Sequence, residues 1–465
     1  MNIISNHMPT AELQALDAAH HMHPFTEDAD LAKKGARIIT RADGVTLTDS
    51  DGLQYLDAMA GLWCVNIGYG RHELAEAAAR QMREMPYYNT FFQTSHVPAI
   101  ALSAKLAELV PGDLNHVFYA SSGSEANDTN IRMVRHYWAA KGKPDKTIII
   151  SRKNAYHGST LGGASLGGMQ PMHAQGGLPI PDIQHIDEPN WWEGGGEMSP
   201  EEFGLERARQ LEQAIHDLGE NRVAAFIAEP IQGAGGVIVP PESYWPEIQR
   251  ICDDHEILLI ADEVICGFGR TGNWFGSQTY GIRPDIMSIA KGLSSGYAPI
   301  GGSMVNDEIA DVIGSAGVFN HGYTYSGHPM SCAVALENLR LLEEEKIVDT
   351  VRDDTGPYLQ GKWAQLVDHP LVGEAVIKGF MGSIVLTPDK SARAAFASEE
   401  GTVAVICRDR CLANGLVMRQ KAERMIISPP LIMSRGDIDM LIERVAKSLD
   451  ETLKIARDKG LMVSA

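Results

Sequence analysis

Two stretches of the sequence decide its fold: Ile257-Leu258-Leu259-Ile260-Ala261-Asp262-Glu263 and Ser288-Ile289-Ala290-Lys291-Gly292-Leu293-Ser294-Ser295-Gly296. Each begins with a short apolar run, which predicts a buried strand. The first run ends at Asp262, and the second ends at Lys291 before a turn rich in glycine and serine. Open α/β sheets bind ligands outside the carboxyl ends of their strands, so these two side chains are candidates for one site.

Other short apolar runs precede these two, and helical patterns or long loops separate them. Residues Pro200 to Leu218 carry apolar side chains at near-helical spacing, which predicts a helix that connects two strands. This alternation predicts an α/β fold, in which a mostly parallel sheet has helices on both faces. The expected strands are His116 to Ala120, Thr147 to Ser151, Val223 to Ala228, Ile257 to Ala261 and Asp285 to Ala290.

The chain has 465 residues, of which 44% are hydrophobic, enough for one large and one smaller packed domain. After about residue 330 the pattern changes to a helix, short strands and a final helix over residues 438–456. We therefore expect a large domain over residues 61–330 and a smaller C-terminal domain over residues 331–465. The N-terminal segment, residues 1–60, is expected to pack with the smaller domain.

The charge balance and the lack of targeting patterns exclude several classes of function. Lys and Arg number 40 against 60 Asp and Glu, a formal net charge of -20, which disfavours binding to nucleic acid or to anionic membranes. No signal peptide pattern opens the chain, and no apolar run reaches the roughly 18 residues of a spanning helix, so we expect a soluble cytoplasmic protein. The cysteines form no CxxC pair, which favours neither disulfide bonds nor a structural metal site.

Histidines cluster near the N-terminus at His20, His21 and His23. Metal ligands are one interpretation of such a cluster, but these histidines lie in a polar stretch without carboxylate or cysteine partners. We interpret them as solvated or packed histidines and expect no metal site in the protein.

The segment Ala120-Ser121-Ser122-Gly123-Ser124-Glu125-Ala126-Asn127 follows an expected strand and precedes an amphipathic helix. Ser122 and Glu125 have the spacing of a capping box. A glycine- and serine-rich turn at a helix start offers backbone N–H groups, hydroxyls and the positive end of the helix dipole to a phosphate. A capped helix start without a ligand is the alternative.

Asp262 alone fits a structural ion pair, and Lys291 alone fits a surface lysine with a buried stem. Together with the turn at residues 120–127, which could bind phosphate, these two side chains favour another interpretation. An aldehyde cofactor with a pyridine ring and a phosphate tail needs an amine, an acid facing the ring nitrogen and a phosphate cradle. All three groups follow strands in this chain.

From about residue 24 to beyond residue 430, the chain resembles the class III (omega) aminotransferases, which are pyridoxal phosphate enzymes of fold type I. The resemblance implies a large domain with a mostly parallel sheet of the seven-stranded type and a smaller α+β domain built from both termini. Its motifs are AGLWCVNIGYGR at 60–71, SGSEAN at 122–127, YHG at 156–158, AEP at 228–230, ADEV at 261–264, AKG at 290–292 and TYSGHP at 324–329.

The resemblance implies that pyridoxal 5'-phosphate is carried as a Schiff base on Lys291, which then moves the substrate proton, while Asp262 keeps the ring nitrogen protonated. It also implies that Thr324 reaches the phosphate from a second subunit, which requires a homodimer or a dimer of dimers with shared active sites. Tyr156 and Val264 are expected on the two faces of the ring. The implied cofactor contacts are Ser122, Gly123, Ser124, Tyr156, His157, Glu229, Asp262, Val264, Lys291 and Thr324.

Within the family, the blocks GLWCVN (61–66) and YNTFF (88–92) are most similar to the amine:pyruvate branch, which includes enzymes acting on putrescine and polyamines. That similarity implies a mostly aromatic substrate pocket and an arginine, Arg419, that binds the carboxylate of the acceptor. It also implies transfer of an amino group to pyruvate, which gives alanine and an aldehyde or ketone. The pocket residues would be Phe25, Trp63, Tyr156 and Phe91 of the partner subunit.

Several alternatives stay open at this point. The donor is putrescine, a longer polyamine, an omega-amino acid or an aryl amine, and the same cofactor site also serves decarboxylation-dependent transamination and aminomutases. Many family members carry Gln where this chain has Ile265, so the partner of the ring hydroxyl is unassigned. Residues 267–272 match GxGxxG, but a loop-like composition follows them, which argues against a dinucleotide site.

Overall fold

The computed structural model describes residues 8–463, and its centre is a sheet of seven strands in the order β4-β10-β9-β8-β7-β5-β6. Neighbouring strands from β9 to β6 pair in parallel, and only β10 runs antiparallel to both of its neighbours. The expected mostly parallel sheet is therefore confirmed. Its strands are β4 (His116–Ala120), β5 (Ile148–Arg152), β6 (Ile183–Ile186), β7 (Val223–Ala228), β8 (Leu258–Asp262), β9 (Ile286–Ile289) and β10 (Gly301–Val305).

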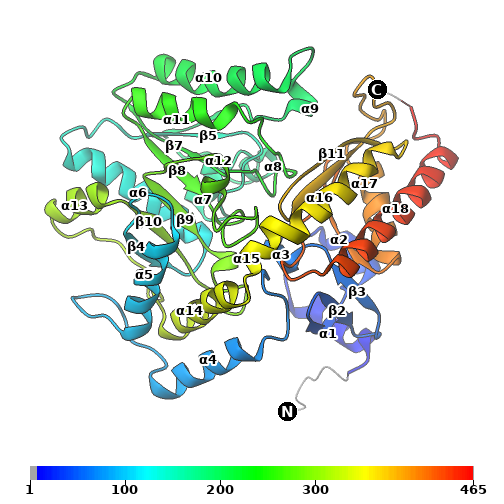
Figure 1. The fold of residues 1–465 in the computed structure, drawn as a ribbon, viewed down its shortest axis with the longest axis horizontal. Helices are drawn as coiled ribbons and strands as arrows, with labels where there is room; N and C mark the ends of the chain where they lie inside the picture. The colour runs from blue at the N-terminus through cyan, green and yellow to red at the C-terminus, as the bar shows by residue number, and fades with distance from the viewer. Residues whose placement is uncertain (1–7, 464–465) are drawn as a thin grey trace.

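Helices cover both faces of this sheet (Figure 1). On one face, α10 (Pro200–Leu218) and α11 (Tyr244–Asp254) pack on Ile148 and Ile150. On the other face, α6 (Gly123–Ala140) packs on Ile149. Successive strand side chains point to opposite faces, so a strand covered on both sides is apolar throughout, as the sequence pattern predicts. The remaining helices of this half are α5 (Val97–Leu109), α7 (Leu161–Leu166), α8 (Gln170–His173), α9 (Trp191–Gly194), α12 (Gly276–Tyr280) and α13 (Asp307–Ser315).

Two smaller sheets lie beside the large one. One has the order β1-β2-β3-β13 and joins the two ends of the chain, because β3 pairs in parallel with β13. The other has the order β11-β12-β15-β14 and is entirely antiparallel. Their strands are β1 (Ile39–Asp43), β2 (Thr46–Asp49), β3 (Gln54–Asp57), β11 (Val372–Lys378), β12 (Met381–Leu386), β13 (Leu416–Val417), β14 (Arg419–Lys421) and β15 (Arg424–Ile427).

Long helices complete the C-terminal part of the chain. The final helix, α18, begins after a capping box formed by Ser434 and Asp437, which explains why it starts before the expected residue 438. The domain limits at residues 60 and 330 stay a prediction. The helices of this part and of the N-terminal region are α2 (Asp28–Lys34), α3 (Ala60–Trp63), α4 (His72–Glu84), α14 (Pro329–Glu344), α15 (Ile347–Thr350), α16 (Gly356–Ala364), α17 (Thr402–Ala413) and α18 (Arg435–Asp458). Within residues 8–463, no helix combines the length and apolar character needed to cross a membrane.

The N-terminal histidines differ from expectation. Helix α1 (Thr10–His20) places Asp17 four residues before His21, and the carboxylate of Asp17 contacts both His21 and His23. The expectation that no carboxylate accompanies these histidines is therefore wrong. The reason is helical geometry, since residues four apart lie on one face of a helix.

Candidate active site

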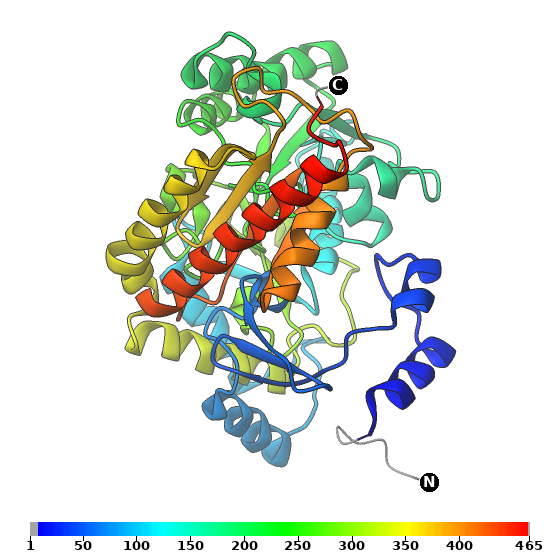
Figure 2. The ribbon, with the colours of Figure 1, turned by 90° about the vertical axis from the view of Figure 1, so that its right-hand side faces the viewer.

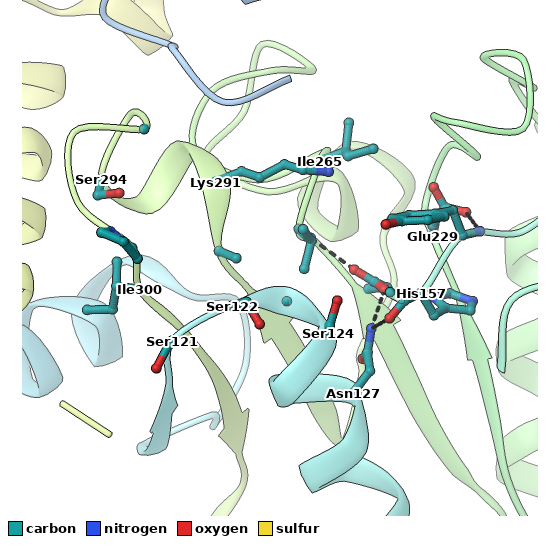
Figure 3. Close-up of a pocket in the computed structure, with 18 of the residues that line it drawn as sticks. Ser121, Ser122, Ser124, Asn127, His157, Glu229, Ile265, Lys291, Ser294 and Ile300 are labelled. Carbon is teal, nitrogen blue, oxygen red and sulfur yellow. Dashed lines mark hydrogen bonds and ion pairs between the residues drawn. The ribbon is translucent and has the colours of Figure 1, made fainter. Parts of the chain in front are cut away.

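A cavity of about 330 Å³ lies where β4, β8 and β9 end at their carboxyl termini, the edge at which the sequence predicts a site (Figure 3). It gathers most of the residues expected to contact a cofactor. These are Ser122, Gly123, Ser124, Tyr156, His157, Glu229, Asp262, Val264 and Lys291. The other lining residues are Ser121, Asn127, Ile265, Ala290, Ser294, Gly296, Ala298, Pro299 and Ile300.

Asp262 is the last residue of β8, and its buried carboxylate is held by three donors. Oδ2 accepts hydrogen bonds from His157 Nδ1 at 2.7 Å and from Asn127 Nδ2 at 2.8 Å. Oδ1 accepts one from the backbone N–H of Val264 at 3.1 Å. These bonds compensate for burying the charge and fix the direction of the carboxylate beside the cavity.

Asn127 is a site residue to which the sequence reasoning gave no role. It lies in the first part of α6, and its Nδ2 donates to the carbonyl of His157 as well as to Asp262. Its Oδ1 accepts from Ser288 Oγ at 2.6 Å and from Asn130 Nδ2 at 3.2 Å. Asn127 and its hydrogen-bond partners are all buried. Rotation of the Asn127 amide would therefore leave a buried polar atom without a partner.

Lys291 follows β9 and extends across the cavity toward Ile265 (Figure 3). Its φ of 46° lies in the left-handed region, which is uncommon for a residue with a side chain and typical of functional turns. Burial lowers the pKa of its amine, although Asp262 and Glu229 act in the opposite direction. Burial therefore favours the neutral, nucleophilic form of this lysine.

The start of α6 forms the turn expected to bind phosphate. Ser122 Oγ accepts the N–H of Glu125 at 3.2 Å, whereas the Glu125 carboxylate accepts the N–H of Ser121 at 2.7 Å, one residue earlier than in a capping box. The N–H groups of Gly123 and Ser124 belong to the first helical turn, which has no intrahelical acceptors for them. A Cβ on Gly123 would lie 2.9 Å from Val264 Cγ2, so a larger residue there would force Val264 to move.

Glu229 follows β7 and is buried beside the cavity. Its Oε1 accepts the N–H of Tyr156 at 3.1 Å, and its Oε2 accepts the N–H of Gly233 at 2.8 Å. Desolvation raises the pKa of this carboxyl. Its two oxygens thus hold backbone around the cavity, while Ile265 presents an apolar surface to it.

Arg419 lies on β14, outside the residues that line the cavity. Burial lowers the pKa of its guanidinium, and its charge acts in turn to lower the pKa of Lys291. Within residues 8–463 its side chain makes no hydrogen bond or ion pair. A partly buried guanidinium without a protein partner can accept a carboxylate from a ligand.

The remaining expected residues do not line this cavity within one chain. Trp63 is buried in an apolar cluster that includes Ile265, and Phe25 is 77% exposed. Phe91 lines a second cavity of about 880 Å³, and the carbonyl of Thr324 accepts a hydrogen bond from the Tyr87 hydroxyl at 2.6 Å. The expected contacts of Phe91 and Thr324 with the site were assigned to a second subunit and stay predictions.

Comparison with known proteins gives a family match along most of the chain. The model of the family described as Aminotransferase class-III matches residues 30–449. A putrescine–pyruvate aminotransferase from Pseudomonas aeruginosa is 57% identical over 452 residues, which cover 97% of this chain and 99% of that protein. The chloroplastic gamma aminobutyrate transaminase 3 of Solanum lycopersicum is 40% identical over 456 residues, which cover 97% of this chain and 87% of that protein.

Solved structures agree with these relatives. An omega transaminase from Pseudomonas jessenii in complex with PMP has a TM-score of 0.93 and 41% identity, covering 95% of this chain and 98% of that one. A thermostable (S)-enantioselective omega-transaminase from Thermomicrobium roseum has a TM-score of 0.92 and 42% identity, covering 97% of this chain and 100% of that one. The resemblance in fold therefore extends over nearly the whole molecule.

Proposed function

The chain belongs to the class III aminotransferases, which use pyridoxal 5'-phosphate, and from that premise we propose that it transfers the amino group of putrescine or a related primary amine to pyruvate. The products are an amino aldehyde, or a ketone from a secondary carbon, and alanine. The observation that supports the proposal most is one cavity with an amine at Lys291, a fixed carboxylate at Asp262 and a phosphate-type helix start at Ser122–Ser124.

The donor set of the cavity fits pyridoxal 5'-phosphate. The turn at Gly123 packs closely against Val264 and offers N–H groups to a phosphate. Asp262 would face the ring nitrogen, and the apolar side chain of Val264 would pack on one face of the ring opposite Tyr156. When bound, the cofactor supplies a ring that accepts electrons from the substrate carbon.

The protein's own groups then have distinct roles. Asp262 would face the ring nitrogen and favour a proton there, because hydrogen bonds from His157 and Asn127 fix the direction of its carboxylate. Lys291 Nζ would hold the cofactor and, once the amine substrate is bound in its place, would take the proton from the substrate carbon. The same nitrogen delivers a proton in the reverse direction when pyruvate is the substrate. Glu229 positions the backbone of Tyr156.

The pKa of Lys291 predicts how cofactor uptake depends on pH. The neutral amine attacks the aldehyde, so the rate at which apoenzyme takes up cofactor should rise with pH and become constant above the pKa of this lysine. Burial lowers that pKa, so we expect the plateau to begin below pH 10.5, the ordinary value for lysine. Stopped-flow absorbance of apoenzyme mixed with cofactor measures this rate. A rate that still rises at pH 10.5 would contradict the proposed environment of Lys291.

Arg419 is proposed to bind the carboxylate of pyruvate, and the Arg419→Ala variant tests this. Loss of a bidentate, charge-assisted pair of about 1.5–3 kcal/mol should raise the KM for pyruvate about 10- to 150-fold. The first half reaction with 1-phenylethylamine, which has no carboxylate, should change by less than about threefold. Lys421→Ala, which removes a cation on the same strand, is the matched control. Equal losses for amine and pyruvate would remove the proposed role.

We also propose a homodimer with shared active sites, either alone or as a dimer of dimers. Phe92 and Val318 are 92% and 79% exposed in the single chain, and both line the second cavity together with Phe91. An apolar surface of this kind is typical of an interface between subunits. In the dimer, Phe91 and Thr324 would reach the partner's site. Sedimentation velocity should give a species of at least twice the chain mass, and a monomer would contradict the proposal.

The visible absorption spectrum of the purified enzyme tests the proposed reaction. The cofactor band should fade when putrescine or 1-phenylethylamine is added and return when pyruvate follows, with alanine formed in equal amount. We keep the predicted cytoplasmic location for this reaction, since it consumes small metabolites. If a cofactor band is present but no amine changes it, the family assignment stands and decarboxylation-dependent transamination or an aminomutase reaction replaces the proposed one.

A further inference from the structure

Asp17, His21 and His23 form a compact group of metal-ligand atoms at the end of α1. His21 Nδ1 lies 3.1 Å from Asp17 Oδ1, and His23 Nε2 lies 2.8 Å from Asp17 Oδ2. The two imidazole rings have centroids 4.3 Å apart. One ligand atom from each of the three residues lies within 4.8 Å of the others.

We propose that Asp17, His21 and His23 bind one divalent transition-metal ion of the zinc type. Around a tetrahedral ion with ligand bonds of about 2.0–2.2 Å, neighbouring ligand atoms lie about 3.3–3.5 Å apart. The observed spacings of 2.8 and 3.1 Å between carboxylate and imidazole atoms differ from this by a few tenths of an ångström. Small side-chain rotations would therefore convert the hydrogen-bonded group into a chelate.

The local chain geometry explains why these residues meet. Asp17 and His21 are four residues apart at the end of α1, so they lie on the same helical face. The helix stops at His20, and His21 takes an extended conformation with φ −117° and ψ 122°. The chain direction changes at that point and brings His23 to the second oxygen of Asp17. The ligands thus come from a segment of seven residues and need no distant part of the fold.

The donor set selects the class of metal. Two imidazoles and one carboxylate suit Zn²⁺, Co²⁺ or Ni²⁺, whereas Mg²⁺ and Ca²⁺ prefer oxygen ligands. Three protein ligands leave a fourth position for water. The side chain of His21 is 60% exposed, which gives an ion access, while those of Asp17 and His23 are 16% and 21% exposed and form the inner part of the group.

A bound ion would also stabilise a helix that has little other support. No residue of α1 is buried, and its described links to the rest of the chain are a few side-chain hydrogen bonds, such as Gln14 Nε2 to the carbonyl of Ala36 at 2.9 Å. Figure 2 shows the blue N-terminal helices at the edge of the molecule, and Thr10 Oγ1 of α1 donates to Ser50 Oγ, just after β2, at 2.8 Å. The ion would tie the last turn of α1 to the segment that leads to Phe25, and so would fix where that segment leaves the helix.

Cobalt and zinc titrations of the untagged holoenzyme test the proposal. After removal of metals with a chelator, Co²⁺ should produce visible ligand-field bands that saturate at one ion per chain, and Zn²⁺ should abolish them. The His21→Gln, His23→Gln double variant should lower Co²⁺ affinity at least tenfold and lose the saturating bands. Aminotransferase activity should be unaffected by the pair of substitutions at low metal, which shows that the variant is folded.

His20→Gln is the matched control, because His20 lies in the same stretch but is not one of the three residues whose ligand atoms come together. This variant should bind Co²⁺ as the parent protein does. A second readout is trypsin digestion after Lys33, Lys34 and Arg37, which should slow when Zn²⁺ is added to the parent and not to the double variant. Equal Co²⁺ binding by the parent and the double variant, or no saturable binding by the parent, would overturn the proposal.

Discussion

Lys291→Ala should lower kcat for transamination by at least about 10³-fold, since one substitution removes both the covalent anchor of the cofactor and the base that moves the substrate proton. The cavity should still bind the cofactor without a covalent bond, because the phosphate-type turn and Asp262 remain. Initial rates with putrescine and pyruvate measure the loss. The absorption spectrum and equilibrium dialysis measure cofactor binding.

Added primary amines separate the two roles of Lys291. A small amine such as ethylamine can enter the space left by the deleted side chain and act as the base, so it should restore part of the activity of Lys291→Ala. Lys143→Ala removes a half-exposed lysine that follows α6 and should leave the rate unchanged. Full activity of Lys291→Ala without added amine would refute the assignment.

Much of the fold could be predicted because its central strands are buried on both faces. The expected limits of β4 and β7 match the observed ones, and those of β5, β8 and β9 differ by one residue at each end. The helix α10 also matches, since Ser199 and Glu202 form a capping box and α10 ends before Gly219. A short apolar run with clear end signals therefore located these strands, including the edge strand β4, of which only Tyr119 and Ala120 are buried.

Two strands of the large sheet were missed for identifiable reasons. The edge strand β6 has four residues, and its two central ones, Gln184 and His185, are polar, so it presents no apolar run. The strand β10 begins with Gly301 and Gly302, and glycine has a low preference for strands. A Cβ on Gly301 would lie 2.6 Å from the backbone of Ser122, so the close approach of two segments requires glycine there. That requirement arises from a tertiary contact, which a local pattern does not contain.

In the candidate site, too, local sequence patterns predicted some residues, whereas the role of another depends on a tertiary contact. Lys291, Asp262 and the turn at Ser122–Ser124 each follow a strand, so strand ends and residue type were enough to group them. Asn127 stands in a quoted motif, but its role depends on Asp262, which is 135 residues away in the chain. One signal in the sequence could have pointed to Asn127. It is an amide side chain one helical turn after the expected phosphate-binding turn, on the helix that packs against the strand ends.

Asp262→Asn tests the proposed role of the Asp262 carboxylate at the ring nitrogen, because it replaces the carboxylate with a neutral amide of the same size. The amide oxygen can still accept hydrogen bonds from His157 and Asn127, so we expect the fold and the cavity to persist. A neutral amide does not favour a proton on the ring nitrogen, and the ring then withdraws electrons less strongly. We expect kcat to fall by about 10²-fold or more, measured in single-turnover experiments with a saturating amine.

Two control variants distinguish whether the fall in kcat of Asp262→Asn comes from the lost carboxylate charge. Asp285 is a mostly buried carboxylate at the opposite end of the same strands, where it accepts the N–H of Leu259 at 2.8 Å. Asp285→Asn should therefore affect stability more than kcat. Asn127→Ala keeps the charge of Asp262 but removes one of its donors, so it should lower kcat about tenfold and remain less harmful than Asp262→Asn. If Asn127→Ala were the more damaging change, orientation of the carboxylate rather than its charge would be the property that catalysis requires.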